Sequence, residues 1–142
     1  MKRRGINSYK ELAPYILSAY SIENREEQIA LEDLDFSFDV LLPFPSALES
    51  ALEQGSNRGF YRSLSISFKN CTFKKLHSSQ KEHTVNYEFD DCRFDELNFS
   101  QTTFKGKIKC YHSTFQNAYF NNTTFKDLAD FFMCTFKKPI SF

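Results

Sequence analysis

Four cysteines are the residues of this 142-residue sequence with the greatest capacity for metal binding or redox chemistry. When the chain is written in rows of 21 residues, Cys71, Cys92, Ser113 and Cys134 fall in one column, and Cys110 falls in a column of phenylalanines. Zn²⁺ requires about four ligands at tetrahedral angles, and a straight column interrupted by a serine does not supply them. We therefore expect reduced thiols that pack in the core, with no metal and no cofactor.

The three histidines, His77, His83 and His112, share no spacing typical of metal ligation or of a catalytic triad. We expect all three at the solvated surface, with His77 and His83 in a loop over residues 76–84. The sequence also contains no Gly-rich phosphate loop and no Ser/His/Asp arrangement. It predicts no catalytic residue, and we expect the protein not to be an enzyme.

Aromatic and sulfur-containing side chains are expected at four outward positions in the last rows of the sequence. Phe132 and Met133 follow a central phenylalanine at positions where other rows carry Lys, Asp, Asn or Gln. Tyr111 and His112 precede them by 21 residues, so we expect the four side chains to form one patch. Exposed patches of this composition are typical of protein interfaces. We interpret the patch as a partner-binding surface, with one alternative, in which the acidic N-terminal segment or the loop 76–84 covers it.

Lysines near one corner of the repeat do not indicate a nucleic-acid site. The charged residues of this corner are Lys105, Lys107, Lys109, Lys126, Asp127 and Asp130. Because the two signs are interleaved, we interpret the corner as a solvated, mixed surface. The whole chain has 18 basic and 18 acidic residues and no net charge, which excludes a strongly basic nucleic-acid binder on bulk charge.

A regular spacing of phenylalanine predicts the elements that would position these residues. The chain contains 17 Phe and no Trp, and from residue 68 on Phe recurs mostly every five residues, with one extra residue per row of 21. A period of this length predicts a solenoid in which each coil buries its inward residues against the next coil. The predicted inward residues are Phe68, Phe73, Phe89, Phe94, Phe99, Phe104, Cys110, Phe115, Phe120, Phe125, Phe131 and Phe136.

The outward positions provide an independent test of the 21-residue register. In this register three basic residues lie beside three acidic residues one coil later, at the separation of about 4.8 Å between neighbouring strands. Such cross-strand pairs of opposite charge stabilise a sheet only slightly, but three of them in register support the alignment. The pairs are Lys69–Asp90, Lys74–Asp95 and Lys75–Glu96.

Residues 64–142 resemble the pentapeptide-repeat family, whose motif is a small residue, any residue, Leu or Phe, and two polar residues. Matching stretches include Cys71-Thr-Phe73-Lys-Lys, Cys92-Arg-Phe94-Asp-Glu and Cys134-Thr-Phe136-Lys-Lys. The resemblance implies a right-handed quadrilateral β-helix with the small residue and the Phe directed inward. Some members of this family resemble B-form DNA in shape and charge and bind DNA gyrase or another topoisomerase.

The start of the chain carries a helix signal. Ser8 and Glu11 have the spacing of a capping box and precede an apolar stretch, which predicts a helix that reaches about Tyr20. Pro14 lies inside this stretch, so the helix is expected to kink there or to begin later than the capping box.

Further local patterns predict a mixed α/β segment before the repeats. Residues 22–33 are acidic and helix-permissive, whereas residues 34–40 alternate strictly between apolar and polar, which is typical of a half-buried strand. A second capping box from Ser46 to Glu49 predicts a short helix that Gly55 ends.

These patterns divide the chain into two parts. Residues 1–59 carry six basic and ten acidic residues, a net charge of −4, and residues 60–142 therefore carry +4. We expect a mainly β protein in which residues 1–59 form a small α/β capping segment. Residues 60–142 are expected to form the pentapeptide-repeat β-helix, with about 3.5 coils of 21 residues. A topoisomerase-binding mechanism requires an acidic rod, which a net charge of +4 does not favour.

The expected function is that of a non-enzymatic module whose rigid surface binds a macromolecular partner, as an inhibitor or a topoisomerase-binding protein. Two alternatives stay open: the soluble N-terminal part of a larger membrane-associated, channel-like pentapeptide-repeat protein, and a small immunity or inhibitor protein. The expected partner is a protein, and a homodimer through the C-terminal coil is a further option because nothing caps that coil. No apolar run approaches the roughly 18 residues that span a bilayer, and no apolar stretch of an export signal follows the first four residues. We therefore expect a cytoplasmic location.

Overall fold

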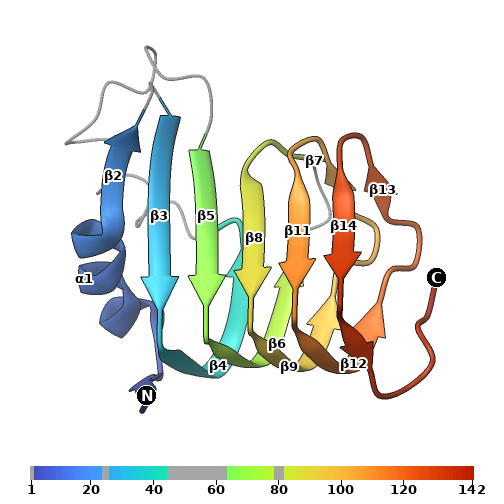
Figure 1. The fold of residues 1–142 in the computed structure, drawn as a ribbon, viewed down its shortest axis with the longest axis horizontal. Helices are drawn as coiled ribbons and strands as arrows, with labels where there is room; N and C mark the ends of the chain where they lie inside the picture. Colours follow the sequence, from blue (N-terminus) through green and yellow to red (C-terminus); the bar gives the residue numbers. More distant parts are fainter. Residues whose placement is uncertain (1, 24–25, 45–63, 79–81) are drawn as a thin grey trace.

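The computed structural model describes residues 2–23, 26–44, 64–78 and 82–142, which form a mainly β protein with one helix (Figure 1). In chain order the elements are β1 (Arg4–Ile6), α1 (Tyr9–Ala19), β2 (Tyr20–Glu23), β3 (Glu26–Glu32), β4 (Leu34–Leu42), β5 (Leu64–Lys69), β6 (Thr72–Ser78), β7 (Glu82–His83), β8 (Asn86–Asp90), β9 (Arg93–Asn98), β10 (Thr103–Phe104), β11 (Ile108–Tyr111), β12 (Thr114–Tyr119), β13 (Thr124–Phe125), β14 (Ala129–Phe132) and β15 (Thr135–Phe136).

The strands form three sheets whose neighbouring strands are almost all parallel. Sheet A has the order β1-β4-β6-β9-β12-β15, sheet B has the order β14-β11-β8-β5-β3-β2, and sheet C has the order β13-β10-β7. From β3 onward the chain passes repeatedly from sheet B to sheet A, and from β5 onward a strand of sheet C follows each strand of sheet A up to β13. We call each such passage a coil. Each strand therefore pairs with the strand of the same sheet in the preceding and the following coil, as the stacked arrows of Figure 1 show.

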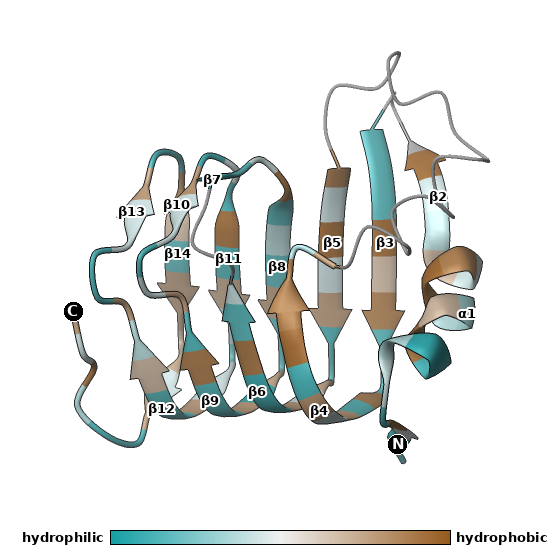
Figure 2. Ribbon diagram, turned by 180° about the vertical axis from the view of Figure 1, so that it is seen from behind, coloured by the Kyte–Doolittle hydropathy of each residue, from teal (hydrophilic) through white to brown (hydrophobic). Residues whose placement is uncertain are grey.

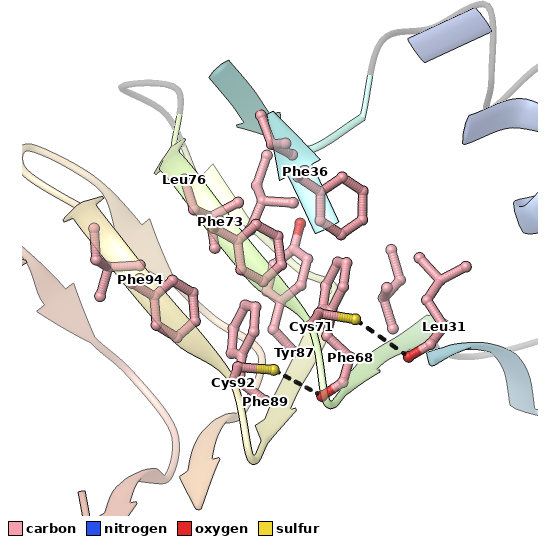
Figure 3. Packing of buried hydrophobic residues seen from close by; sticks show 14 of the residues in the cluster. Leu31, Phe36, Phe68, Cys71, Phe73, Leu76, Tyr87, Phe89, Cys92 and Phe94 are labelled. Carbon is pink, nitrogen blue, oxygen red and sulfur yellow. Dashed lines mark hydrogen bonds between the residues drawn. The ribbon is translucent and has the colours of Figure 1, made fainter. Parts of the chain in front are cut away.

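The 21-residue register of the phenylalanines is confirmed in sheets A and B. In sheet A, Phe73, Phe94, Phe115 and Phe136 are partners across successive strands, and Phe36 of β4 extends the same column. Their rings stack nearly parallel with centroids 4.7 to 5.0 Å apart. In sheet B the corresponding column is Leu31, Phe68, Phe89, Cys110 and Phe131. Figure 3 shows the two columns meeting in the core.

Inward positions are buried in the central coils and less so in the last one. Of the predicted inward residues, those from Phe68 to Phe120 are buried, whereas Phe125, Phe131 and Phe136 are partly buried and pack against the core. Outward positions alternate with them, so hydrophobic and hydrophilic residues alternate along the strands (Figure 2). The final residues run parallel to the end of β12, where Ser141 pairs with Tyr119 and the amide of Phe120 donates to the carbonyl of Ser141 at 2.7 Å.

The predicted loop over residues 76–84 is wrong where the structure describes it. β6 continues through Ser78, and β7 pairs with β10, which places His83 beside Phe104 in the inward column of sheet C. Both Ser78 and His83 are buried, and the Ser78 hydroxyl lies 2.6 Å from the Thr102 hydroxyl. Polar residues can occupy these inward positions because pairing with the next coil holds the backbone in place.

Residues 22–33, although helix-permissive, form strands in the part that the structure describes. β2 and β3 form an antiparallel hairpin at one end of sheet B, and β3 pairs in parallel with β5. Ile29 and Leu31 of β3 are buried in the core. Burial of these alternate residues favours a strand and outweighs a weak helix propensity. The strand expected at residues 34–40 is confirmed as β4.

The first helix is confirmed with the expected cap. The Ser8 hydroxyl accepts a hydrogen bond from the Glu11 amide at 3.2 Å, and α1 continues across Pro14 to Ala19. Leu12 and Ile16 are buried, and α1 lies beside β3 at the N-terminal end of the stacked coils (Figure 1). The helix predicted near Ser46 lies outside the described residues.

One corner between sheets B and A has the same backbone conformation in every coil. Its residue has a positive φ of 51° to 59° each time, and the corner amide donates to a carbonyl of the next coil in the first four cases. Asn and Asp adopt this left-handed conformation more readily than other non-glycine residues. The five corner residues are Asp33, Asn70, Asp91, His112 and Met133.

Candidate functional site

The predicted patch is assembled by the last two strands of sheet B and by the corners that follow them. Tyr111 of β11 and Phe132 of β14 are partners in the sheet, and their ring centroids lie 6.5 Å apart at 77°. The His112 ring lies 6.0 Å from the Phe132 ring at 86°, and Met133 follows Phe132 at the next corner. The structure thus brings the four residues together as the 21-residue period predicts.

Phe132 and Met133 are exposed, with relative accessibilities of 56% and 66%. The described parts of the N-terminal segment and of residues 76–84 therefore leave both side chains in contact with solvent. Large apolar side chains gathered on a charged surface are uncommon unless they serve an interaction.

The same two outward columns carry polar residues in the earlier coils. Beside Tyr111 and Phe132, the sheet column continues with Asp90, Lys69 and Glu32, which alternate in charge. The corner column continues with Asp91, Asn70 and Asp33. The change from charged to aromatic side chains is therefore confined to the last two coils.

Carboxylates dominate the electrostatic surroundings of Tyr111. Removal of its phenol from water, together with the negative charges of Asp130, Glu88 and Asp90, raises the pKa of Tyr111 above its ordinary value. The phenol therefore stays protonated at neutral pH and keeps its hydrogen for donation.

The cysteine column serves packing and backbone hydrogen bonding. Cys71 and Cys92 direct their thiols toward carbonyl oxygens of the preceding coil, those of Leu31 at 3.9 Å and Phe68 at 3.3 Å (Figure 3). Ser113 occupies the same column, and its hydroxyl accepts from the Cys92 amide at 3.1 Å. These residues satisfy polar groups that repeat in every coil.

Neither the thiols nor the carboxylates and imidazoles of the described residues gather into a group of three or more that could hold a metal ion. Burial raises the pKa of the Cys110 thiol well above its usual range, so this sulfur is a neutral core atom rather than a nucleophile.

The histidines lie in different places and do not form one site. His112 is exposed within the patch, and His77 is half-buried on β6, where burial lowers its pKa. The prediction that His83 is a solvated surface residue is wrong, because its ring is buried 5.2 Å from the Phe104 ring. The 21-residue register places His83 one row before the inward Phe104, but a polar residue at this position suggests a break in the repeat.

A shallow hollow of about 320 Å³ on the outward face of sheet B is a feature that sequence reasoning missed. It is lined by Ser65 and Ser67 of β5 and by longer side chains of β3, β8 and β11, among them Gln28, Glu88 and Lys109. Two serines at alternate outward positions between strands with longer side chains are the signal that could have located it.

Comparison with protein-family models, with curated proteins and with solved structures finds no match to this chain. In the part of the chain that the structure describes, no helix has the length and apolar character needed to cross a membrane.

Proposed function

We propose that the protein is a non-enzymatic interaction module that binds a protein partner through Tyr111, His112, Phe132 and Met133. The observation that carries the proposal is the exposure of Phe132 and Met133 in columns that hold charged or amide side chains in the preceding coils. Aromatic residues and Met are enriched at protein interfaces, where they supply large apolar contact areas.

We also propose that the stacked coils are the right-handed quadrilateral β-helix of pentapeptide-repeat proteins. The 21-residue coil, the inward Phe at five-residue spacing and the inward Cys or Ser two residues before Phe73, Phe94, Phe115 and Phe136 support this assignment. A fold of this kind offers flat, rigid faces, so an interface residue loses little backbone entropy on binding.

The distribution of charge favours a general protein partner over a topoisomerase that recognises a DNA-like rod. Residues 26–44 carry six acidic and no basic residues, and residues 64–78 carry three Lys and no acidic residue. Residues 82–102 carry six acidic residues and one Arg, and residues 103–123 carry three Lys and no acidic residue. Net charge therefore changes sign over these four stretches, and residues 124–142 carry three Lys and two Asp. Imitation of DNA requires negative charge along the whole stack.

Affinity capture with a Phe132→Ser variant tests the proposed function. The wild-type chain is expected to retain a partner from an extract of the source cell, and Phe132→Ser is expected to lose at least about nine-tenths of it, since a central aromatic anchor typically contributes more than about 2 kcal/mol to binding. Leu17→Ser on α1 is the matched control, because Leu17 is 52% exposed, at the opposite end of the stack.

Circular dichroism and thermal unfolding must show that both variants are folded. Equal capture of the partner by wild type and by a folded Phe132→Ser protein would contradict the proposed function.

A further inference from the structure

Three carboxylates lie beside the aromatic part of the patch on the outward face of sheet B. The strands β8, β11 and β14 place six residues in two rows that run across the sheet. The first row is Glu88, Lys109 and Asp130, and the second is Asp90, Tyr111 and Phe132. We call these six residues the β8–β14 array. The array contains three carboxylates and one ammonium group, so it carries an excess of negative charge around two aromatic rings.

The fold does not pair these carboxylates with cations in the way that it pairs others. The ion pairs among the described residues join Lys75 to Glu96 at 3.5 Å, and join Glu82 to Lys105 at 2.9 Å and to Lys126 at 3.9 Å. The carboxylates of the β8–β14 array are in none of them. In the register Lys109 stands between Glu88 and Asp130, and Lys69 of β5 lies beside Asp90. Among the described residues, neither lysine forms an ion pair with one of these carboxylates.

The aromatic residues of the array are suited to the same kind of ligand as the carboxylates. Phe132 is 56% exposed, and the half-buried Tyr111 ring packs edge-to-face with it. A cationic side chain over an aromatic ring is attracted by the ring quadrupole. A carboxylate within reach of the same cation adds a charge-assisted hydrogen bond.

We propose that the β8–β14 array binds an arginine side chain of the partner, flanked in the partner by an apolar residue that contacts Met133. The inference rests on the proposed function and specifies the chemistry of its ligand. Arginine fits better than lysine because its planar guanidinium stacks on a ring and also donates two parallel hydrogen bonds to a carboxylate. Asp90 and Asp130 lie on the two strands that flank Tyr111, so a guanidinium on this ring has an acceptor on either side.

The raised pKa of Tyr111 is consistent with this reading. Besides removal from water, its causes include the charges of Asp130, Glu88 and Asp90, all of which raise the pKa. The carboxylates that disfavour a negative charge on the phenol attract a positive charge at the same place.

Two short peptides provide the probes for a direct test. They are N-acetyl-Leu-Arg-Leu-amide and its citrulline counterpart, which has nearly the same shape but no charge and has a carbonyl oxygen in place of one NH₂ group. The full chain is labelled with ¹³C at the methionine methyl groups, and the signal of Met133 is assigned from its absence in Met133→Leu. We expect saturable shifts of this signal and about tenfold tighter binding of the arginine peptide.

Variants of the carboxylates separate charge recognition from apolar contact. The double variant Asp90→Asn/Asp130→Asn is expected to reduce the preference for arginine to about twofold or less while the citrulline peptide binds as before. Asp127→Asn is the matched control, because it removes one charge from the same coil, and its Oδ1 atom still accepts from the Leu128 amide. Raising the salt concentration is expected to weaken binding of the arginine peptide alone.

Equal affinity for the two peptides would overturn the arginine inference and leave the interaction surface in place, since both peptides would still bind beside Met133. Absence of any saturable shift of the Met133 signal with the arginine peptide would also overturn the inference. Unchanged partner capture by folded Phe132→Ser would instead remove the proposed function itself, so the two failures are distinguishable.

Discussion

Met133 combines an unfavourable backbone conformation with an apolar side chain that is exposed to solvent. Its φ is 53°, and its side chain is 66% exposed. A residue other than Gly, Asn or Asp in the left-handed region costs about 1 kcal/mol or more, and the corresponding corner of an earlier coil has Asn70. We therefore expect Met133→Asn to increase the free energy of unfolding by about 0.5–1 kcal/mol, measured by urea denaturation.

The same substitution is expected to weaken partner binding, because it removes an apolar side chain from the proposed interface. A gain in stability with a loss of binding is the trade-off typical of functional positions. Met133→Leu is the control, since it keeps an apolar side chain without relieving the backbone. If Met133→Asn were less stable than wild type, the argument from backbone conformation would be wrong.

Gly106, in the connection between β10 and β11, shows how closely successive coils approach each other. A Cβ atom at this position would lie 2.4 Å from the carbonyl oxygen of Val85 and 2.7 Å from its carbonyl carbon. Because these are backbone atoms of the preceding coil, they cannot move aside without disturbing the parallel pairing. We expect Gly106→Ala to lower the free energy of unfolding by about 1–3 kcal/mol.

Gly5→Ala in β1 provides the control for this prediction. No atom lies within 4 Å of a Cβ built on Gly5, so the same chemical change is expected to leave stability within about 0.5 kcal/mol of wild type. Thermal and urea unfolding of the two variants measure the difference. Equal effects at both positions would show that the loss at Gly106 comes from the glycine backbone and not from the contact between coils.

The sequence predicts those elements whose partners lie one period away. Phe73 and Phe94 are 21 residues apart and pair as expected, and Lys75 forms its predicted ion pair with Glu96. In contrast, Leu31 of β3 pairs with Phe68, at a distance of 37 residues along the chain, because residues 45–63 separate the two coils. The 21-residue period is invisible there, and local propensity alone suggests a helix.

The candidate site is likewise predictable from the sequence only in part. The apolar members of the patch are predictable because they interrupt outward columns that are otherwise charged or polar. The surroundings of Asp90 are predictable only in part, because the register places it between Lys69 and Tyr111 but does not show whether Lys69 forms an ion pair with it. Which carboxylates lack a cation depends on side-chain positions in three neighbouring coils, and a one-dimensional pattern does not contain this information.

At the scale of the whole molecule, the stack is asymmetric, with strong burial in its centre and weaker burial in its last coil. The inward rings of β6, β9 and β12 have stacked neighbours on both sides, with Phe94 between Phe73 and Phe115 at 5.0 and 4.8 Å. In the structure the last ring of this column, Phe136, stacks on Phe115 alone at 4.7 Å and is half-buried. The surface proposed for partner binding belongs to these less buried coils. Substitution of side chains there is expected to reduce the stability of the core least.

This asymmetry predicts different costs for the same truncation at two positions of one column. Phe94 is fully buried, so Phe94→Ala is expected to lower the free energy of unfolding by about 3–5 kcal/mol. Phe136→Ala removes the same atoms from a half-buried position, and we expect about half that loss because less apolar area returns to water and less of a cavity is left. Urea denaturation measures both values, and amide hydrogen exchange should show the lowest protection in β13, β14 and β15. Equal losses at the two positions would mean that the last coil is as tightly held as the centre, and that its exposed patch is part of a rigid surface from one end of the stack to the other.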